Sequence, residues 1–462
     1  MKRLYNWFED RTGLLSFMGK TVRHPVPPKT GWPYVFGSAT LACFILLVVT
    51  GIALATGYTP ATNDAYHSIQ WISDTATFGR ELRGIHYFSA TAMVILVGMH
   101  MARVFLMGSY KYPREMTWLA GVVLLLLTVA MAFTGQLLRW DQTAVWSTFV
   151  AASQAGRTPY IGPTIAHFVL GGSTVGGSTL SHFFAFHVFF MPGLIFLFIG
   201  LHLYLVLHNG ISELPKSGRP VEPETYRAWY QSLLKREGVP FWPDAAWRDV
   251  LFGTSIVAVI VILAVIVGPP KLGPPPDPTI LKASPRPDWY FLWFFSALAE
   301  LPPSLEDWVI LGAPAFFAVM LVLLPLVGNR GERSPLRRPW AIGVTLLAVI
   351  MIGALTVVGE NAPWAPRFEV NALPAKVVGT NTGSVAAGAS VFFKRGCEFC
   401  HTIGGYGGTR GPNLSDISDR LSAANMTIRI LNGGTNMPAF GSILKPTELN
   451  DLVAFLKSRH GS

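Results

Sequence analysis

The chain has 462 residues, of which 51% are hydrophobic and only 13% are charged, and its formal net charge is +10. Soluble globular proteins carry about twice that charged share, so the composition argues against a soluble protein and indicates a membrane protein. The basic residues are spread through loops between apolar runs. This distribution is typical of a solvated cytoplasmic face and argues against a nucleic-acid-binding surface.

Seven apolar runs are long enough to cross a hydrocarbon core of about 30 Å, which takes about 20 helical residues. They predict helices over residues 33–57, 83–107, 117–135, 183–207, 249–268, 308–327 and 340–358. The expected fold is therefore an all-α membrane protein with seven transmembrane helices, a four-helix bundle followed by three more helices, and a small α-helical C-terminal domain.

The charges of the loops predict the orientation of the chain. Lys and Arg are abundant in the N-terminal tail and in the loops after the second, fourth and sixth runs, and the other connections are poorer in them. Positive residues favour the cytoplasmic side, so the N-terminus is expected in the cytoplasm and the segment after the seventh helix outside. The first 30 residues hold no apolar core, so no cleaved signal peptide is expected.

Four histidines lie deep in two of the apolar runs, His86 and His100 in the second and His187 and His202 in the fourth. Polar side chains inside a bilayer are costly and are functional candidates, although a single one could merely bond to a neighbouring helix. Spacings of 14 and 15 residues return to within roughly 60° of one helix face and separate the pair members by about 21–22 Å. His86 is then level with His187, and His100 with His202, which predicts two stacked bis-histidine haem b sites.

Glycines repeat at the same 14-residue spacing in the first and third runs, at Gly37, Gly51, Gly121 and Gly135. Glycine weakens a helix, so the repeat predicts a bulky group, the haem macrocycle, against the backbone, the alternative being ordinary small-residue helix packing. Arg83 and Arg103 lie three residues from His86 and His100. They could neutralise haem propionates, or merely reach toward the membrane interfaces.

Cys397-x-x-Cys400-His401 is the attachment signature of a c-type haem. A zinc site would need further ligands, of which this region offers only His460, and a thiol redox pair does not need the histidine. The motif lies in an expected domain of residues 385–462, a class I-like monohaem cytochrome c, after an expected linker of residues 361–384 rich in Pro, Ala and Gly.

The sixth ligand of this haem is expected to be Met437, which lies in the Gly-rich stretch NGGTNMPAF. Met426 competes with it but lies in a stretch that has a buried helical pattern. Pro412 is expected to form a wall against the haem. Attachment of c-type haem takes place outside the cytoplasm, where the loop charges independently put this domain.

These motifs together resemble cytochrome b of the Rieske/cytochrome b (cytochrome bc) complexes. The resemblance runs from about residue 14 to 360 and is carried by the two histidine pairs and by RGIH, YPREMTW, WDQ and PDWYF. Within an expected domain of residues 1–215, residues 14 to about 215 resemble the four-helix diheme part, in the short-spaced form of the chloroplast-type complexes. Residues 236–360 resemble the three-helix subunit that is a separate chain there. Both parts and a cytochrome c are joined in one polypeptide here.

The stretch SPRPDWYFLW resembles the quinol-oxidation motif of that family, Pro-Glu-Trp-Tyr, with Pro287, Asp288, Trp289 and Tyr290 in the corresponding positions. The resemblance implies that the Asp288 carboxylate takes a proton from quinol, as a general base within reach of a hydroquinone hydroxyl would. Aspartate is one methylene shorter than glutamate, which changes the length of the proton path. The alternative is an interfacial aromatic belt with a Pro-Asp turn.

The resemblance implies a quinol–cytochrome c oxidoreductase in a bacterial cytoplasmic (inner) membrane, with the cytochrome c domain on the outer, extracytoplasmic face. Quinol oxidation would be bifurcated between a Rieske iron–sulfur protein and the two b haems, with proton translocation. The sequence lacks Rieske motifs, so that protein is expected as a separate chain, together with a homodimer and a soluble or membrane electron acceptor. Chloroplast-type members anchor a further haem through a cysteine where this chain has Val35, and Cys43 does not replace it, so no covalent third haem is expected in the membrane part.

Two other functions would share some of these features. A membrane cytochrome b anchor that relays electrons between quinone and a partner dehydrogenase would have the histidine ladder, but should lack PDWYF and the last three helices. A transporter or other non-redox membrane protein with a fused sensor cytochrome would bind no haem b.

Overall fold

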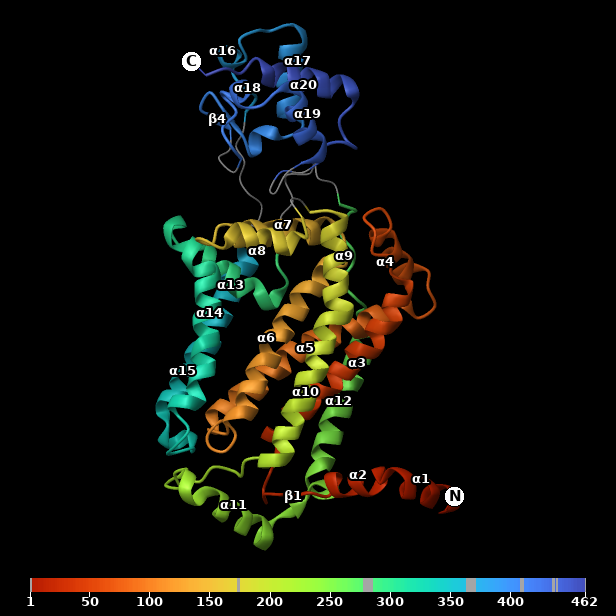
Figure 1. Ribbon diagram of the computed structural model, residues 1–462, viewed down its shortest axis with the longest axis vertical. Coiled ribbons are helices and arrows are strands. Elements are labelled where there is room, and N and C mark those ends of the chain that lie inside the picture. Colours follow the sequence, from red (N-terminus) through yellow and green to blue (C-terminus); the bar gives the residue numbers. More distant parts are fainter. Residues whose placement is uncertain are drawn as a thin grey trace.

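The computed structural model describes residues 2–172, 175–276, 286–362, 371–407, 411–433, 437 and 439–461. Among these residues, seven helices are long and apolar enough to cross a membrane, which confirms the predicted all-α membrane fold (Figure 1). The spans are α3 (Phe36–Gly57), α5 (Gly79–Leu106), α6 (Glu115–Leu137), α9 to α10 (Gly177–Asn209), α12 (Ala246–Ile266), α14 (Pro303–Val327) and α15 (Pro339–Asn361).

The first four spans form two helix pairs that face each other. α3 packs along α5, and α6 packs along α10 (Met191–Asn209), so the faces that carry the histidines meet in the middle of the bundle. α12 packs against α3 and α5, whereas α14 packs against α6. The short apolar helix α13 (Trp289–Ala299) packs against α15. The last three spans thus cover the bundle on two sides.

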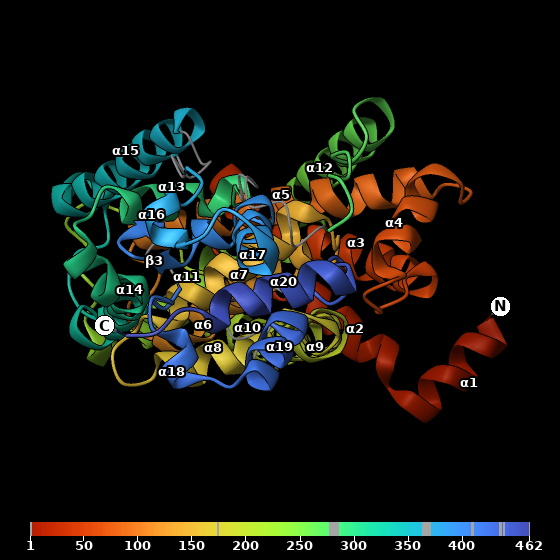
Figure 2. The same cartoon turned by 90° about the horizontal axis from the view of Figure 1, so that it is seen from above.

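Short elements close both ends of the bundle, which we call upper and lower as they are drawn in Figure 1. At the upper end lie α4 (Ala65–Asp74), α7 (Gln142–Gly156) and α8 (Gly162–Leu170). At the lower end lie α11 (Pro223–Glu237) and a two-stranded sheet, in which β1 (Pro25–Val26) runs antiparallel to β2 (Val239–Pro240). The remaining turns of helix near this end are η1 (Trp32–Tyr34), η3 (Phe241–Ala245) and η4 (Pro335–Arg337). The N-terminal helices α1 (Lys2–Thr12) and α2 (Leu14–Val22) project sideways in both views (Figures 1 and 2).

Buried arginines join the two halves of the membrane part at the lower end. Arg333, from the loop between α14 and α15, forms an ion pair with Glu213 and donates through Nε to the carbonyl of Met107, 3.3 Å away. Arg338 donates to the carbonyl of Phe105 at 3.1 Å. Cations on these last carbonyls stabilise the C-terminus of α5. Two of the arginines whose charge predicted a cytoplasmic loop, Arg333 and Arg338, therefore hold α5 to the last two spans.

We predict that Arg333→Met destabilises the membrane part by about 3–5 kcal/mol, because it leaves the carboxylate of Glu213 without its buried partner. Arg337→Met is the matched control: this arginine is exposed in the same loop and should cost about 0.5 kcal/mol or less. Cys43 is fully buried in α3, so the rate at which it reacts with a thiol reagent in denaturant reports unfolding. Equal labelling rates in the two variants would contradict the prediction.

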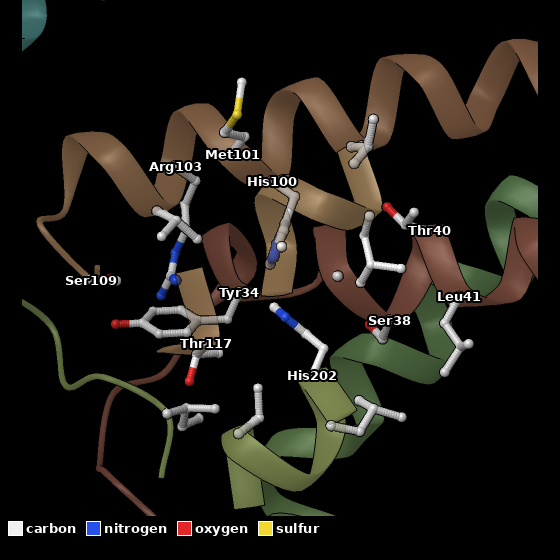
Figure 3. Close-up of a pocket in the computed structure, with 18 of the residues that line it drawn as sticks. Tyr34, Ser38, Thr40, Leu41, His100, Met101, Arg103, Ser109, Thr117 and His202 are labelled. Atoms are coloured by element: carbon white, nitrogen blue, oxygen red, sulfur yellow. The ribbon is translucent and has the colours of Figure 1, made fainter. Parts of the chain in front are cut away.

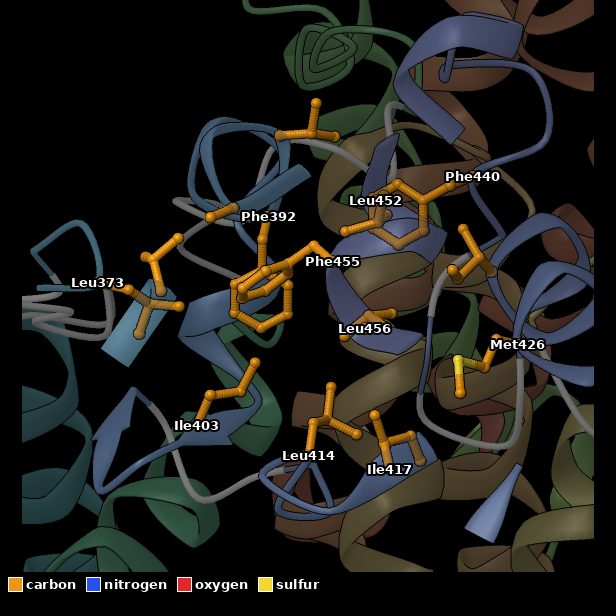
Figure 4. Close-up of a cluster of buried hydrophobic side chains, with 14 of the residues drawn as sticks. Leu373, Phe392, Ile403, Leu414, Ile417, Met426, Phe440, Leu452, Phe455 and Leu456 are labelled. Carbon is orange, nitrogen blue, oxygen red and sulfur yellow. The ribbon is translucent and has the colours of Figure 1, made fainter. Parts of the chain in front are cut away.

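The C-terminal domain is a small helical unit at the upper end (Figures 1 and 2). Its helices are α16 (Ala375–Val378), α17 (Gly383–Lys394), α18 (Ile417–Arg420), α19 (Ala423–Asn432) and α20 (Pro446–Lys457), with a helical turn η5 (Cys397–Phe399) and strands β3 (Thr402–Ile403) and β4 (Tyr406–Gly407). α17 crosses α20 at Gly388, where an added Cβ would stand 2.0 Å from the carbonyl oxygen of Asp451. Only glycine permits this approach, which brings Phe392 against Phe455 in the core (Figure 4).

The expected linker includes residues 363–370, which lie outside the described residues. Residues 371–379 also belong to that expected linker, but they pack on the C-terminal domain. Leu373 and Val378 are part of its buried core, and Arg459 donates to the carbonyl of Val378 at 3.0 Å. In the structure, the packed C-terminal unit therefore begins near residue 371.

Candidate haem and quinol sites

The four predicted histidines meet as two pairs in the centre of the bundle. The ring centroids of His86 and His187 are 6.3 Å apart, and those of His100 and His202 are 6.5 Å apart. Two imidazoles on one metal, with bonds of about 2.0–2.1 Å and ring centres about 1.1 Å beyond each nitrogen, would have centroids about 6.3 Å apart. Both pairs therefore fit bis-histidine ligation of a haem iron.

Threonine hydroxyls fix the upper pair in the tautomer that a metal requires. Thr50 donates its hydroxyl proton to the carbonyl of Leu46 at 2.6 Å, so its oxygen accepts from Nδ1–H of His86 at 2.9 Å. Thr134 relates to His187 in the same way, with Oγ1 to Nδ1 at 3.1 Å. The Nε2 lone pair of each ring is then free for iron, and the ring orientation is held. The sequence analysis did not identify these two threonines.

A π-helical turn over Phe186–Phe190 includes His187. Such a turn takes up about one extra residue relative to an α-helix. It accounts for the spacing of 15 residues between His187 and His202, against 14 between His86 and His100. The turn thereby brings His187 and His202 level with His86 and His100.

The four glycines lie against the histidine rings. An added Cβ would stand 3.3 Å from His86 at Gly51 and 3.1 Å from His100 at Gly37. On the other helix pair, the corresponding nearest distances are 3.4 Å from His202 at Gly121 and 2.6 Å from His187 at Gly135. The bulky group found beside each glycine is thus the imidazole of the paired helix. These contacts follow from the packing of α3 on α5 and of α6 on α10, and contact of the glycines with a haem macrocycle stays a prediction.

We predict that Gly135→Ala removes or strongly perturbs the upper haem. Its methyl group would overlap Cε1 of His187 and push the ring away from the iron position, a cost of about 1–3 kcal/mol. Gly121→Ala is the control, because its Cβ would make an ordinary contact with His202. The content and redox titration of b haem in the two variants test this. Equal b haem content and unchanged potentials would contradict it.

The lower pair opens into a cavity of about 470 Å³, in which His100 and His202 point toward each other (Figure 3). Arg103 stacks 3.7 Å over the ring of Tyr34 at its edge, and its buried Nε and Nη2 have no hydrogen-bond partner among the described residues. A buried guanidinium without an acceptor suits a ligand carboxylate. The lower site therefore fits a haem whose propionate meets Arg103.

Arg83 is already engaged by protein. It donates to Ser73 at 3.0 Å and to the carbonyl of Pro270 at 2.7 Å, which ties α5 to α4 and to the segment after α12. Val35, where a further covalent haem would need a cysteine, lines the lower cavity, whereas Cys43 does not line it and is buried in an adjoining apolar cluster.

The quinol-motif residues lie at the start of α13, against the upper end of α6. Tyr290 donates its hydroxyl proton to the Asp288 carboxylate at 2.9 Å, and the same hydroxyl is 3.4 Å from the carbonyl of Ala132. Pro287 is buried, and Trp289 is 38% exposed. Ala132 is one turn of α6 from the glycine that contacts His187. The carboxylate therefore lies in the part of the fold that holds the upper histidine pair.

The C-terminal domain brings Cys397, His401 and Met437 to one apolar cavity, whereas Met426 is buried in the core and does not line this cavity. His401 Nδ1 is 2.8 Å from the carbonyl oxygen of Pro412, which can only accept, so the ring donates there and leaves Nε2 for iron. Pro412 thus orients His401 through its carbonyl, and its expected role as a wall against the haem stays a prediction. These residues fit one covalently attached haem with His401 and Met437 as axial ligands.

A buried carboxylate that the sequence analysis did not identify lies within the attachment motif. Glu398 is 1% exposed, accepts one bond from the backbone N–H of Leu373 at 3.2 Å, and has a second oxygen without a partner among the described residues. Burial raises the pKa of Glu398 to about 7.

We predict that the stability of this domain falls between about pH 4.5 and pH 7, by on the order of 2–3 kcal/mol. The unfolded chain ionises Glu398 first, so the stabilisation is complete below the unfolded pKa and is lost as the pH rises through the folded pKa. Glu398→Gln should remove this dependence. Denaturant unfolding of the full chain at pH 5 and pH 8, followed by haem c absorbance, tests the sign. A wild-type stability that rises over this range would refute it.

Comparisons with known proteins cover both parts of the chain. The model described as Cytochrome b/b6/petB matches residues 21–210, and that described as Cytochrome b(C-terminal)/b6/petD matches residues 276–377. The model for Cytochrome C oxidase, cbb3-type, subunit III matches residues 383–456.

Individual relatives agree with these matches. Cytochrome b6 of Acaryochloris marina (strain MBIC 11017) is 38% identical over 212 residues, and that of Mastigocladus laminosus is 36% identical; each match covers 46% of this chain and 99% of the relative. A solved structure titled "Hyperthermophilic respiratory Complex III" is similar with a TM-score of 0.66 and 26% identity, over 78% of this chain and 91% of that chain. The resemblance drawn from the sequence is confirmed.

Proposed function

The chain belongs to the cytochrome b/b6 family, and from this premise we propose that it is the core of a quinol–cytochrome c oxidoreductase. The observation that carries the proposal is the ladder of two histidine pairs, with ring centroids 6.3 Å and 6.5 Å apart, beneath a quinol motif and a haem c domain. The proposed reaction is the bifurcated oxidation of quinol at the upper end, coupled to proton translocation.

The cofactors in this proposal are two b haems, one held by His86 with His187 and one by His100 with His202, and a haem c attached to Cys397 and Cys400. When bound, they supply one-electron transfer across the membrane and away from its outer face. One electron of each quinol is proposed to leave through a separate Rieske iron–sulfur protein to the fused haem c. The other is proposed to cross to a quinone at the lower end.

Asp288 is the proposed acceptor of the quinol proton. Its carboxylate already accepts a hydrogen bond from Tyr290, which holds it in one orientation beside α6. The buried Pro287 fixes the entry into α13, and the partly exposed Trp289 offers an aromatic surface to the quinol ring. A positioned base next to the hydroxyl of a hydroquinone typically contributes about 10²–10⁴-fold to the rate.

The lower cavity extends past the histidine pair to a second polar group that supports a quinone-reducing site. The hydroxyl of Ser38 donates to the carboxylate of Asp249, and both residues line the cavity together with Arg248 and Phe241. Quinone that gains electrons there must also gain protons, and Asp249 is the proposed donor. The sequence analysis did not identify Asp249, because its partner Ser38 lies 211 residues away along the chain.

The remaining parts of the proposal concern orientation and partners. The loop charges support a cytoplasmic N-terminus and an extracytoplasmic haem c domain in a bacterial inner membrane. A homodimer and a soluble or membrane electron acceptor follow from the family. The alternative of a plain cytochrome b anchor leaves α12 to α15 and the bond between Tyr290 and Asp288 without a role.

Rapid mixing of oxidised complex with quinol tests this function. In one turnover, a b haem and haem c are expected to become reduced together, and removal of the Rieske protein is expected to stop reduction of haem c. Reduction of haem c by quinol at an unchanged rate without the Rieske protein would contradict bifurcation.

A further inference from the structure

Buried arginine nitrogens without a partner occur at two places in the described part of the chain. Among the described arginines, only Arg103 and Arg139 carry such atoms, both nitrogens of Arg103 noted above and Nε of Arg139. Arg103 lies one turn beyond His100, at the edge of the lower site. Arg139 was not expected to have any role from the sequence. The Arg139 side chain as a whole is 26% exposed, but a buried guanidinium nitrogen without an acceptor is a donor site for an anion.

The position of Arg139 connects it to the upper histidine pair. It follows α6 by two residues, and Leu138 between them keeps a helical conformation (φ −64°, ψ −12°). Arg139 therefore continues the helix face of Gly135, four residues earlier, which lies against the ring of His187. This places Arg139 at the upper edge of that pair, as Arg103 lies at the edge of the lower one.

The nearest carboxylate does not satisfy this arginine. Nε of Arg139 is 3.8 Å from Oδ2 of Asp141, which is too long for a hydrogen bond. Asp141 is 1% exposed and its oxygens accept from the backbone of Ala144 at 2.8 Å and of Gly273 at 3.1 Å. Asp141 thus caps α7 and binds the segment after α12. The Nε–H of Arg139 remains without an acceptor among the described residues.

Arg83, the arginine that the sequence suggested for this site, already bonds to protein groups. Two of its nitrogens donate to Ser73 and to the carbonyl of Pro270. A new acceptor would have to share or replace these bonds.

We propose that Arg139 receives a propionate carboxylate of the upper b haem and raises the reduction potential of that haem, while Arg83 ties the surrounding loops together. The inference rests on the proposed function, because it requires a haem b between His86 and His187. A nearby cation favours the reduced iron, which carries one positive charge fewer. With an effective dielectric constant of about 20, removal of the arginine's charge shifts the equilibrium between oxidised and reduced haem by roughly tenfold, or about 59 mV for one electron.

Redox titration of the two b haems in the purified holo-complex tests the inference. Arg139→Gln is expected to lower the reduction potential of one b haem, which corresponds to a roughly tenfold change in its redox equilibrium constant. Arg103→Gln is expected to lower the potential of the other b haem. Arg139→Lys keeps the charge and should shift its component by less than about threefold. Arg83→Gln should lower thermal stability, because it removes the bonds to Ser73 and to the carbonyl of Pro270.

Several results would overturn the assignment. Arg139→Gln with two b haems and unchanged potentials would do so, as would a shift of the same component by Arg139→Gln and Arg103→Gln. Loss of one b haem from Arg139→Gln but not from Arg139→Lys supports it, whereas loss from both overturns it. Failure of the proposed function would give a different result, because the wild-type complex itself would then lack two titrating b haems.

Discussion

His202→Leu is expected to yield a protein that retains haem c and one b haem but lacks the lower b haem. His202 forms one side of the lower pair, at 6.5 Å from His100 between ring centroids, and leucine offers iron no ligand. Electrons from quinol could then reach the upper pair but not the lower quinone. Bifurcated turnover should fall to background, with the ratio of b to c haem reduced from two to one.

His208→Leu is the matched control for this variant. His208 lies on the same helix, but it is exposed and stacks on Tyr204 with centroids 5.9 Å apart. It should keep both b haems and normal turnover. A His202→Leu protein with a full complement of b haem would show that the lower pair does not bind iron.

Asp288→Asn is expected to lower quinol-dependent turnover by about 10²–10⁴-fold while both b haems stay bound. The amide keeps the shape of the side chain and can still accept from Tyr290, but it cannot take a proton from quinol. The loss should appear in kcat/KM for quinol, measured as reduction of haem c at steady state.

Asp288→Glu provides the control, because it restores a carboxylate at the cost of one methylene and should recover most of the rate. Tyr290→Phe removes the bond that orients the carboxylate and should cost less than the loss of the base. Near-normal turnover in Asp288→Asn would remove this residue from the proton path and leave the aromatic-belt alternative for the PDWYF segment.

The histidine ladder could be predicted from the sequence because helical periodicity alone determines which residues share a face. The same reasoning found the glycines, which in the structure lie against the histidine rings. The difference of one residue between the two ladders had no explanation until the π-helical turn at His187 was seen. Local irregularity of this kind leaves no clear signature in an apolar run.

The residues that sequence analysis did not identify act through contacts between distant segments. Arg139 is distinguished only by an Nε atom that has no hydrogen-bond partner among the described residues, and Asp249 by a serine from another helix. Glu398 lies inside the haem c motif, but its burial depends on Leu373 from a segment that the composition assigned to a linker. Such contacts follow from packing and cannot be obtained from spacing.

The most direct test of the account is the stoichiometry of haem in the purified chain, measured as pyridine haemochromes. The account predicts two b haems for each haem c, one between His86 and His187 and one between His100 and His202. A protein that holds haem c alone would contradict it, because the histidine pairs would then hold no haem through which electrons could cross the membrane.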